Sequence, residues 1–344
     1  MTGFVGRVLR GGEPDREVLE GAERATLMVV DDPLRQYSSF FLRLLAATVI
    51  ATAGVAADSS TTIIGAMLVA PLMSPMLGVA LAAVRGRWRA VARCACLCLL
   101  GTALVVACSA ALTALIPVAV DMSTNSQVLA RTSPRLVDLV IALAAGFMAS
   151  LASMRRDIPD AVPGVAISAS IVPPLCITGA GLYEGAPGAA MGSLLLFVSN
   201  FVAIQVMGSL VYLLMGLGAR ERTPEGRRVR TAWYAAVAVC AVAVCALLIG
   251  ASAGVLREAE RERRVQDVTS TWLAAFDGDW RVTGLEAEGD DLYVQVAGSG
   301  EAPDARALAR RLRDEGVDFD EVALSVVEEH RSSAPAKDPG PPAG

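Results

Sequence analysis

The stretch IGAMLVAPLMSP, residues 64–75, decides the fold, because it places Pro71 and Pro75 inside an apolar run that extends from residue 60 to residue 84. About twenty apolar residues in a helix cross the hydrocarbon core of a bilayer. A proline inside such a helix removes one backbone hydrogen bond and clashes with the preceding turn. The stretch therefore predicts a membrane-spanning helix that is broken near its middle.

The composition of the whole chain agrees with a membrane protein. Hydrophobic residues make up 54% of the 344 residues and charged residues only 19%, below the usual share in a soluble domain. Six further apolar runs are long enough to span a bilayer: 40–57, 90–116, 136–154, 160–182, 188–218 and 231–254. The sequence thus predicts an all-α polytopic membrane protein with about seven transmembrane helices.

Arginine placement predicts the orientation of these helices. The segments 85–93, 155–159 and 219–230 hold four, two and five arginines, whereas the connections on the other side hold only Arg131 and Arg135. Cytoplasmic loops carry the excess of positive residues. We therefore expect a multi-pass protein of the plasma membrane, with a cytoplasmic N-terminal segment (1–39), one short amphipathic helix in that segment, and an extracytoplasmic C-terminal part.

The chain also repeats itself at a shift of 103 residues. This shift places Pro71 and Leu72 on Pro174 and Leu175, and it places the third apolar run on the sixth. Each repeat, 40–116 and 136–218, holds three predicted spans, so the second repeat starts from the opposite side of the membrane. An outer loop, 117–135, joins the two. The pattern predicts two inverted three-helix repeats, each with a proline-broken second helix, as in many secondary transporters.

After the seventh predicted span, 231–254, the pattern changes to that of a small soluble domain. Residues from 257 to the end are net acidic, and 257–330 show helical and then alternating apolar spacing. A helix is predicted from Pro303 to Glu315, with Gly316 as its stop. The order of elements is αββαβ, which resembles a BON-like domain in order alone. The end, 331–344, is rich in Pro, Ala and Gly and predicts disorder.

Three stretches together resemble the bacterial and archaeal membrane family known as domain of unknown function 389. They are residues 64–75, 163–175 (PGVAISASIVPPL) and 196–204 (LFVSNFVAI), in this order. The resemblance covers roughly residues 38–218. It implies a helical membrane fold and assigns no activity.

Two broken helices in inverted halves would meet near the middle of the membrane, where freed backbone groups need protein or water as partners. Polar side chains lie close to both breaks in the sequence. The candidate substrate or ion pathway is Pro71, Ser74, Ser168, Ser170, Pro173, Pro174, Thr178, Asn200 and Gln205. The alternative is that the helices are merely kinked and packed. The serine and threonine hydroxyls would then bond the backbone of their own helices, and the amide side chains would form hydrogen bonds between helices.

Four carboxylates near predicted helix ends are gate candidates: Asp58, Asp138, Asp157 and Asp160. Acidic mouths on both faces would suit a cation, and solvated turns are the alternative explanation.

We therefore expect a transporter or channel for a small solute or ion, in a bilayer and as a homo-oligomer. The alternative is a non-transporting membrane scaffold or envelope-stress sensor whose outward domain binds a partner. The sequence shows no catalytic set, phosphate loop or metal-ligand spacing, and its only histidine is His330. The sequence therefore predicts no enzyme activity, no cofactor, no metal and no nucleic-acid partner.

Overall fold

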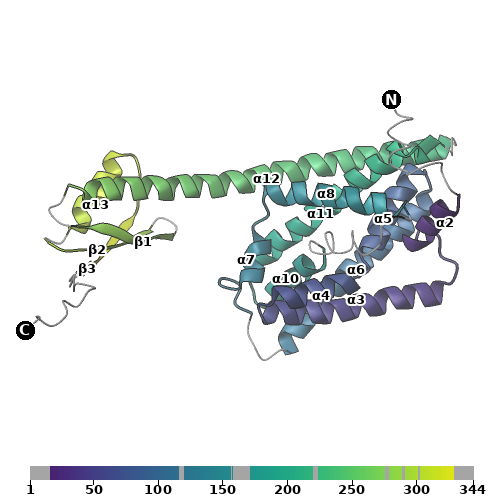
Figure 1. Cartoon of the computed structure of the whole chain (residues 1–344), viewed down its shortest axis with the longest axis horizontal. Coiled ribbons are helices and arrows are strands. Elements are labelled where there is room, and N and C mark those ends of the chain that lie inside the picture. Colours follow the sequence, from purple (N-terminus) through teal and green to yellow (C-terminus); the bar gives the residue numbers. More distant parts are fainter. Residues whose placement is uncertain are drawn as a thin grey trace, which may run out of the picture. The chain divides into compact units, whose positions relative to one another are not determined.

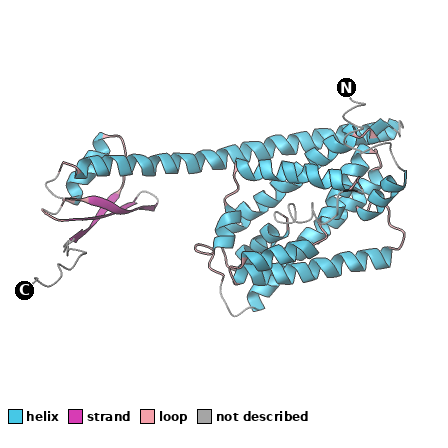
Figure 2. Cartoon of the chain, in the orientation of Figure 1, coloured by secondary structure: helices cyan, strands magenta, loops and turns pink. Residues whose placement is uncertain are grey.

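The computed structural model describes residues 16–115, 120–155, 157, 171–219, 224–275, 279–288, 291–300 and 303–328. Contacts divide the chain into two compact units, Met1–Ser252 and Ala253–Gly344. The described part of the first unit is helical, and the strands belong to the second unit (Figure 2).

The helices of the first unit follow the predicted apolar runs, with one short addition before the first run and one between the third and fourth (Figure 1). They are α2 (Arg16–Ala25), α3 (Pro33–Ala56), α4 (Ser60–Val69), α5 (Met73–Val84), α6 (Trp88–Leu115), α7 (Ser126–Thr132), α8 (Leu136–Ala152), α10 (Val172–Tyr183), α11 (Pro187–Leu214), the 3-10 turn η1 (Leu217–Ala219) and α12 (Pro224–Leu273). The last of these runs across the boundary between the two units. The short amphipathic helix expected in the N-terminal segment is α2.

Among the described residues, four helices are long and apolar enough to cross a membrane: α3, α6, α11 and the part of α12 from Gly226 to Gly250. The number rises to six if the bent pairs α4–α5 and α7–α8 each count as one span. The prediction of a helical membrane fold is therefore confirmed at the level of four to six candidate spans. Of the fifth predicted span, only α10 lies within the described residues.

The break in the second predicted span is present and lies at Pro71. Helix α4 ends at Val69, α5 begins at Met73, and their axes differ by 49°. Ala70 is extended, with φ −68° and ψ 123°, because the residue before a proline avoids the helical region. Pro75, the second proline of this span, does not interrupt the helix. Pro75 lies in the first turn of α5, where its missing N–H costs no helical bond.

The segment predicted as an outer loop, 117–135, holds a helix. Helix α7 begins with Asn125 as its N-cap, whose side-chain oxygen accepts from the N–H groups of Gln127 and Val128. It meets α8 at 87°, so it does not prolong that helix.

The helices of the first unit pack against one another in a reciprocal pattern. Helix α5 contacts α6 and α11, while α10 contacts α11 and α6; α8 lies on α11, and α3 lies on α4, α6 and α10. The contact between α6 and α10 is close at Gly179, where a Cβ atom would lie 2.4 Å from the carbonyl oxygen of Val106. Small residues permit such approaches between apolar helices.

One end of the first unit collects the arginine-rich segments, and we call it the arginine end. The carboxylate of Glu23, on α2, forms an ion pair with Arg85, which follows α5. The hydroxyls of Ser153, after α8, and Tyr212, in the last turn of α11, are 2.9 Å apart. The N-terminal helix, the α5–α6 turn and the ends of α8 and α11 therefore lie together, as the alternating direction of the predicted spans requires.

The opposite end of the first unit is built around α7. Asp58, between α3 and α4, accepts a hydrogen bond from the Ser126 hydroxyl. A Cβ atom on Gly192, near the start of α11, would lie 1.9 Å from the carbonyl oxygen of Thr132. The α3–α4 turn, α7 and the beginning of α11 thus share this end.

The second unit is a small helix-covered sheet with strands β1 (Arg281–Glu288), β2 (Asp291–Gly298) and β3 (Glu321–Glu328). The order is β1-β2-β3; β1 and β2 are antiparallel, whereas β2 and β3 are parallel and joined through α13 (Ala305–Asp314). Parallel neighbours need such a crossover. The core contains Val265, Trp280, Val294 and Leu308.

The order of the elements in the second unit agrees with the predicted αββαβ, and the small C-terminal sheet is confirmed. The first helix of this order is not separate from the seventh predicted span, because both belong to the continuous helix α12. Gly316, at φ +76°, follows α13 as the expected stop. Residues 276–278, 289–290, 301–302 and 329–344, which include the end predicted to be disordered, lie outside the described residues.

Candidate functional site

The residues that follow the two proline positions pack in the same cluster of buried side chains. Leu72 and Leu175, which directly follow Pro71 and Pro174, belong to one cluster of buried side chains. Both helices that start there, α5 and α10, are buried almost throughout. Pro173 and Pro174 occupy the first turn of α10, which proline tolerates.

Of the predicted pathway residues near these starts, Ser74 is half-buried on α5. Ser168 and Ser170 lie outside the described residues.

Gln205 is the predicted pathway residue with the most informative contacts. It lies on α11 and is 1% exposed, and its Nε2 donates to the carbonyl oxygen of Met76 on α5, at 3.0 Å. Its Oε1 is buried and has no hydrogen-bond partner within the part of the chain that the structure describes. A buried acceptor without a partner costs roughly 1–3 kcal/mol. The amide thus ties α11 to the start of α5 and leaves one oxygen open.

An equivalent tie holds the start of α10. The hydroxyl of Ser109, on α6, donates to the carbonyl oxygen of Cys176 at 2.7 Å, and Thr52, on α3, donates to Ser109 at 3.0 Å. All three residues are buried. After Pro71 and after Pro174, a backbone carbonyl therefore accepts a hydrogen bond from the long helix of the other predicted repeat: from α11 at the start of α5, and from α6 at the start of α10.

Two further pathway candidates are buried near these ties. The Thr178 hydroxyl lies 2.9 Å from the carbonyl oxygen of Pro174 and 2.9 Å from the Ser193 hydroxyl on α11. Those contacts agree with the alternative in which hydroxyls bond their own backbone. Asn200 is 2% exposed on α11, five residues before Gln205. Four residues after Gln205, the Ser209 hydroxyl is buried and has no hydrogen-bond partner in the described ranges.

The gate candidate Asp58 has a structural role at the end opposite the arginine end. Its carboxylate accepts from the Ser126 hydroxyl at 2.7 Å and from the Gln127 N–H at 3.2 Å, in the first turn of α7. The Ser126 bond is the main cause that lowers the pKa of Asp58 below its ordinary value. Asp58 is exposed and has a φ of +48°. Its hydrogen bonds connect the α3–α4 turn to α7.

The other gate candidates also have local partners where they are described. The carboxylate of Asp138 accepts from the Arg135 N–H at 2.8 Å and so caps the start of α8. Asp157 pairs with the guanidinium of Arg155, Nε to Oδ1 at 2.8 Å, which lowers the pKa of this carboxyl. Asp160 lies outside the described residues. These contacts favour the explanation by turns and caps over acidic mouths.

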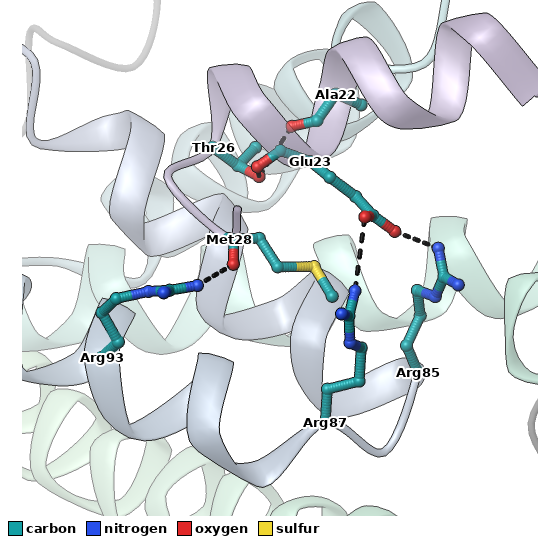
Figure 3. A network of polar contacts seen from close by, with 7 residues as sticks. All are labelled: Ala22, Glu23, Thr26, Met28, Arg85, Arg87 and Arg93. Carbon is teal, nitrogen blue, oxygen red and sulfur yellow. Dashed lines mark hydrogen bonds and ion pairs between the residues drawn. The ribbon is translucent and has the colours of Figure 1, made fainter. Parts of the chain in front are cut away.

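Sequence reasoning missed the docking of the N-terminal segment onto the arginine end (Figure 3). Glu23 is 8% exposed and lies between the guanidinium groups of Arg85 and Arg87, the latter at 3.3 Å. Arg93, on α6, donates to the carbonyl oxygen of Met28. The signal in the sequence was an acid on an amphipathic helix together with an arginine-dense loop; only the fold makes them neighbours.

Within the described ranges, His, Cys, Asp and Glu form no group of three that could hold a metal ion. The features of the described part are apolar helices, a broken span and buried backbone ties at the breaks. They define a helical protein suited to a membrane, with a small sheet-containing unit at its C-terminal end.

Residues 67–206 match the model of the family described as Domain of unknown function (DUF389), which confirms the resemblance seen in the motifs. An uncharacterised protein of Methanocaldococcus jannaschii is 25% identical over 176 residues, covering 51% of this chain and 54% of that protein. The chain thus aligns with about half the length of this curated relative. No solved structure matches.

Proposed function

We propose that the protein is a transporter or channel for a small solute or ion, with its pathway where α5 and α10 begin. The observation that carries this proposal concerns Gln205 on the apolar helix α11. Its Oε1 is buried and accepts no hydrogen bond from the described residues. Buried polar atoms in folded proteins have partners, and ordered water or a bound ligand supplies those that the protein does not.

The chemistry next to the break supports the same proposal. Pro71 has no N–H, so it cannot donate to the carbonyl of Met67 in the last turn of α4. In a membrane, a carbonyl without its helical donor faces protein or a wet cavity. Amide and carbonyl oxygens suit a cation or a solute with donor groups, and half-helix ends form such sites in transporters.

The reciprocal packing supports the inverted repeat that this mechanism needs. Exchanging the repeats exchanges α5 with α10 and α6 with α11, and this turns the contact of α5 with α11 into that of α10 with α6. The backbone ties from Gln205 and Ser109 follow the same exchange. Under this proposal the chain has seven spans, a cytoplasmic N-terminus and an extracytoplasmic C-terminal unit in the plasma membrane.

Cysteine accessibility tests the pathway. In a background without the seven native cysteines, Gln205→Cys should react with a small water-soluble thiol reagent. Val198→Cys and Leu210→Cys, on the same helix at positions 38% and 45% exposed on the outer surface of the bundle, should not react. A thiolate does not form in hydrocarbon, so only a wet position reacts. If none of the three cysteines reacts, the support for a pathway is removed.

The second candidate function, a scaffold or sensor, rests on the sheet of the C-terminal unit. One face of β2 is buried, whereas Tyr293 on the other face is 48% exposed. Tyr293, Gln295 and Ser325 line a hollow of about 640 Å³ on this open face. A photo-crosslinking aromatic residue at position 293 of the full chain should capture a partner there, unlike the same residue at the exposed Arg310. An adduct of twice the mass would support the homo-oligomer.

A further inference from the structure

We infer that the arginine end carries a binding site for the anionic headgroup of an acidic phospholipid. The site is a hollow of about 410 Å³ between the segment that follows α2 and the start of α6. Its lining includes Met28, Arg87, Trp88, Arg89 and Arg93. Three guanidinium groups and one aromatic ring therefore surround one opening.

The charges around this hollow do not balance. Glu23 is the carboxylate that pairs with this arginine cluster, and it is shared by Arg85 and Arg87 (Figure 3). Arg24 and Asp31 nearby satisfy each other at 3.1 Å. Among the described residues, no carboxylate pairs with Arg89 or Arg93, so the hollow keeps two positive charges.

Arg93 shows most directly that the hollow suits an anion. It donates one N–H to the carbonyl of Met28, a neutral group that leaves the charge of the guanidinium in place. Its Nε is buried and has no hydrogen-bond partner among the described residues. Arginine presents its donors as a planar fork that matches the oxygens of a phosphate. Arg93 also lines the hollow, so a phosphate oxygen there would accept from the guanidinium N–H groups that are not donated to the Met28 carbonyl.

Arg89 adds a second positive charge that no carboxylate among the described residues balances. Its guanidinium lies over the ring of Trp88, 5.5 Å from the ring centroid. Both side chains are exposed. The first turn of α6 starts here, and the positive end of the helix dipole adds to the attraction for an anion.

The position of the hollow at the end of a candidate membrane span favours a lipid over a soluble phosphate compound. Trp88 is 56% exposed and is the first residue of α6, one of the helices apolar enough to span a membrane. Tryptophan at the end of a span lies at the level of the headgroups. Val29, Val30 and Ala90 also line the hollow, and they suit the glycerol part of a lipid. Basic pockets at the cytoplasmic ends of spans bind anionic headgroups.

Native mass spectrometry of the full chain in detergent tests this site. Phosphatidylglycerol and phosphatidylcholine with the same acyl chains are titrated separately, and a third titration uses inorganic phosphate. Phosphatidylglycerol should bind more tightly than phosphatidylcholine, and Arg89→Gln should weaken its binding about fivefold, the effect of one arginine near a membrane surface. Arg93→Gln should weaken it at least as much.

Arg89→Gln is the decisive variant, because among the described residues Arg89 forms only the stacking contact with Trp88, whereas Arg93 also donates to the Met28 carbonyl. Arg228→Gln is the matched control, an exposed arginine in the first two turns of α12. Equal losses from Arg228→Gln and Arg89→Gln, or equal binding of both lipids, would refute a built site. Displacement of phosphatidylglycerol by millimolar phosphate would overturn the lipid as its ligand.

Discussion

The contact between α6 and α10 gives a sharp test of the reciprocal packing, through Gly179→Ala. A Cβ atom at this position would lie 2.4 Å from the carbonyl oxygen of Val106 and 3.0 Å from the backbone nitrogen of Ala110. Both are backbone atoms, so neither can turn away. Ordinary contact begins at 3.4 Å, and the two helices must therefore separate by about 1 Å.

That separation acts on the backbone tie at the start of α10. The bond from Ser109 to the Cys176 carbonyl, now 2.7 Å, would lengthen beyond hydrogen-bonding distance. Overpacking of a tight contact costs about 1–3 kcal/mol and a lost hydrogen bond about 1 kcal/mol. The better helix propensity of alanine offsets about 1 kcal/mol. We expect a net loss of about 1–3 kcal/mol.

Thermal unfolding in detergent, followed by size-exclusion chromatography, measures this loss. At about 2–4 °C per kcal/mol for a unit of this size, Gly179→Ala should lower Tm by several degrees. Gly65→Ala is the matched control, because this glycine lies in α4 and a Cβ atom there would meet no atom within 4 Å. It should leave Tm unchanged or slightly raised. If both variants behave alike, α6 and α10 do not approach closely and the argument from reciprocal ties fails.

Four further outcomes are expected. Glu23→Ala should lower Tm by several degrees, because it removes the buried carboxylate that pairs with Arg85, whereas the exposed Glu20→Ala should not. The hydrogen bond from Ser123 lowers the pKa of Asp121 from an ordinary 3.8 to about 2. The stabilising contribution of this carboxylate is therefore complete above pH 4 and is lost as the pH falls towards 2. Limited proteolysis near this loop should rise over that interval and stay flat from pH 5 to 8. A reporter fused after Gly316 should read extracytoplasmic, and a cytoplasmic reading would remove the odd number of spans. Residues 257–330 expressed alone should unfold cooperatively on heating, and a gradual transition would show that this unit needs the rest of the chain.

The contacts of individual side chains show why part of the candidate site could not be predicted from the sequence. Asp58 and Asp138 looked like gate residues because a carboxylate near a span is expensive. Their roles depend on which N–H groups lie within 3.2 Å, those of Gln127 and Arg135. Such partners follow from local backbone geometry, which residue types and spacing alone do not determine.

The sequence by itself determined the class of the protein and the place of the break. Apolar runs predict helices wherever they are long enough, and Pro71 forces Ala70 out of the helical region whatever surrounds it. The strands and the helix of the C-terminal unit also follow from local periodicity and from Gly316. These are effects of the covalent chain within a few residues.

Only the tertiary structure decided which distant groups meet. The tie from Gln205 to Met76 joins residues 129 positions apart, and Glu23 reaches Arg85 over 62 positions. The physical reason is that helices are placed by the packing of their whole surfaces, with close approaches only where a glycine such as Gly179 allows them. Whether a buried amide oxygen keeps a partner or stays open is a result of that packing, and so is the hollow beside Arg93.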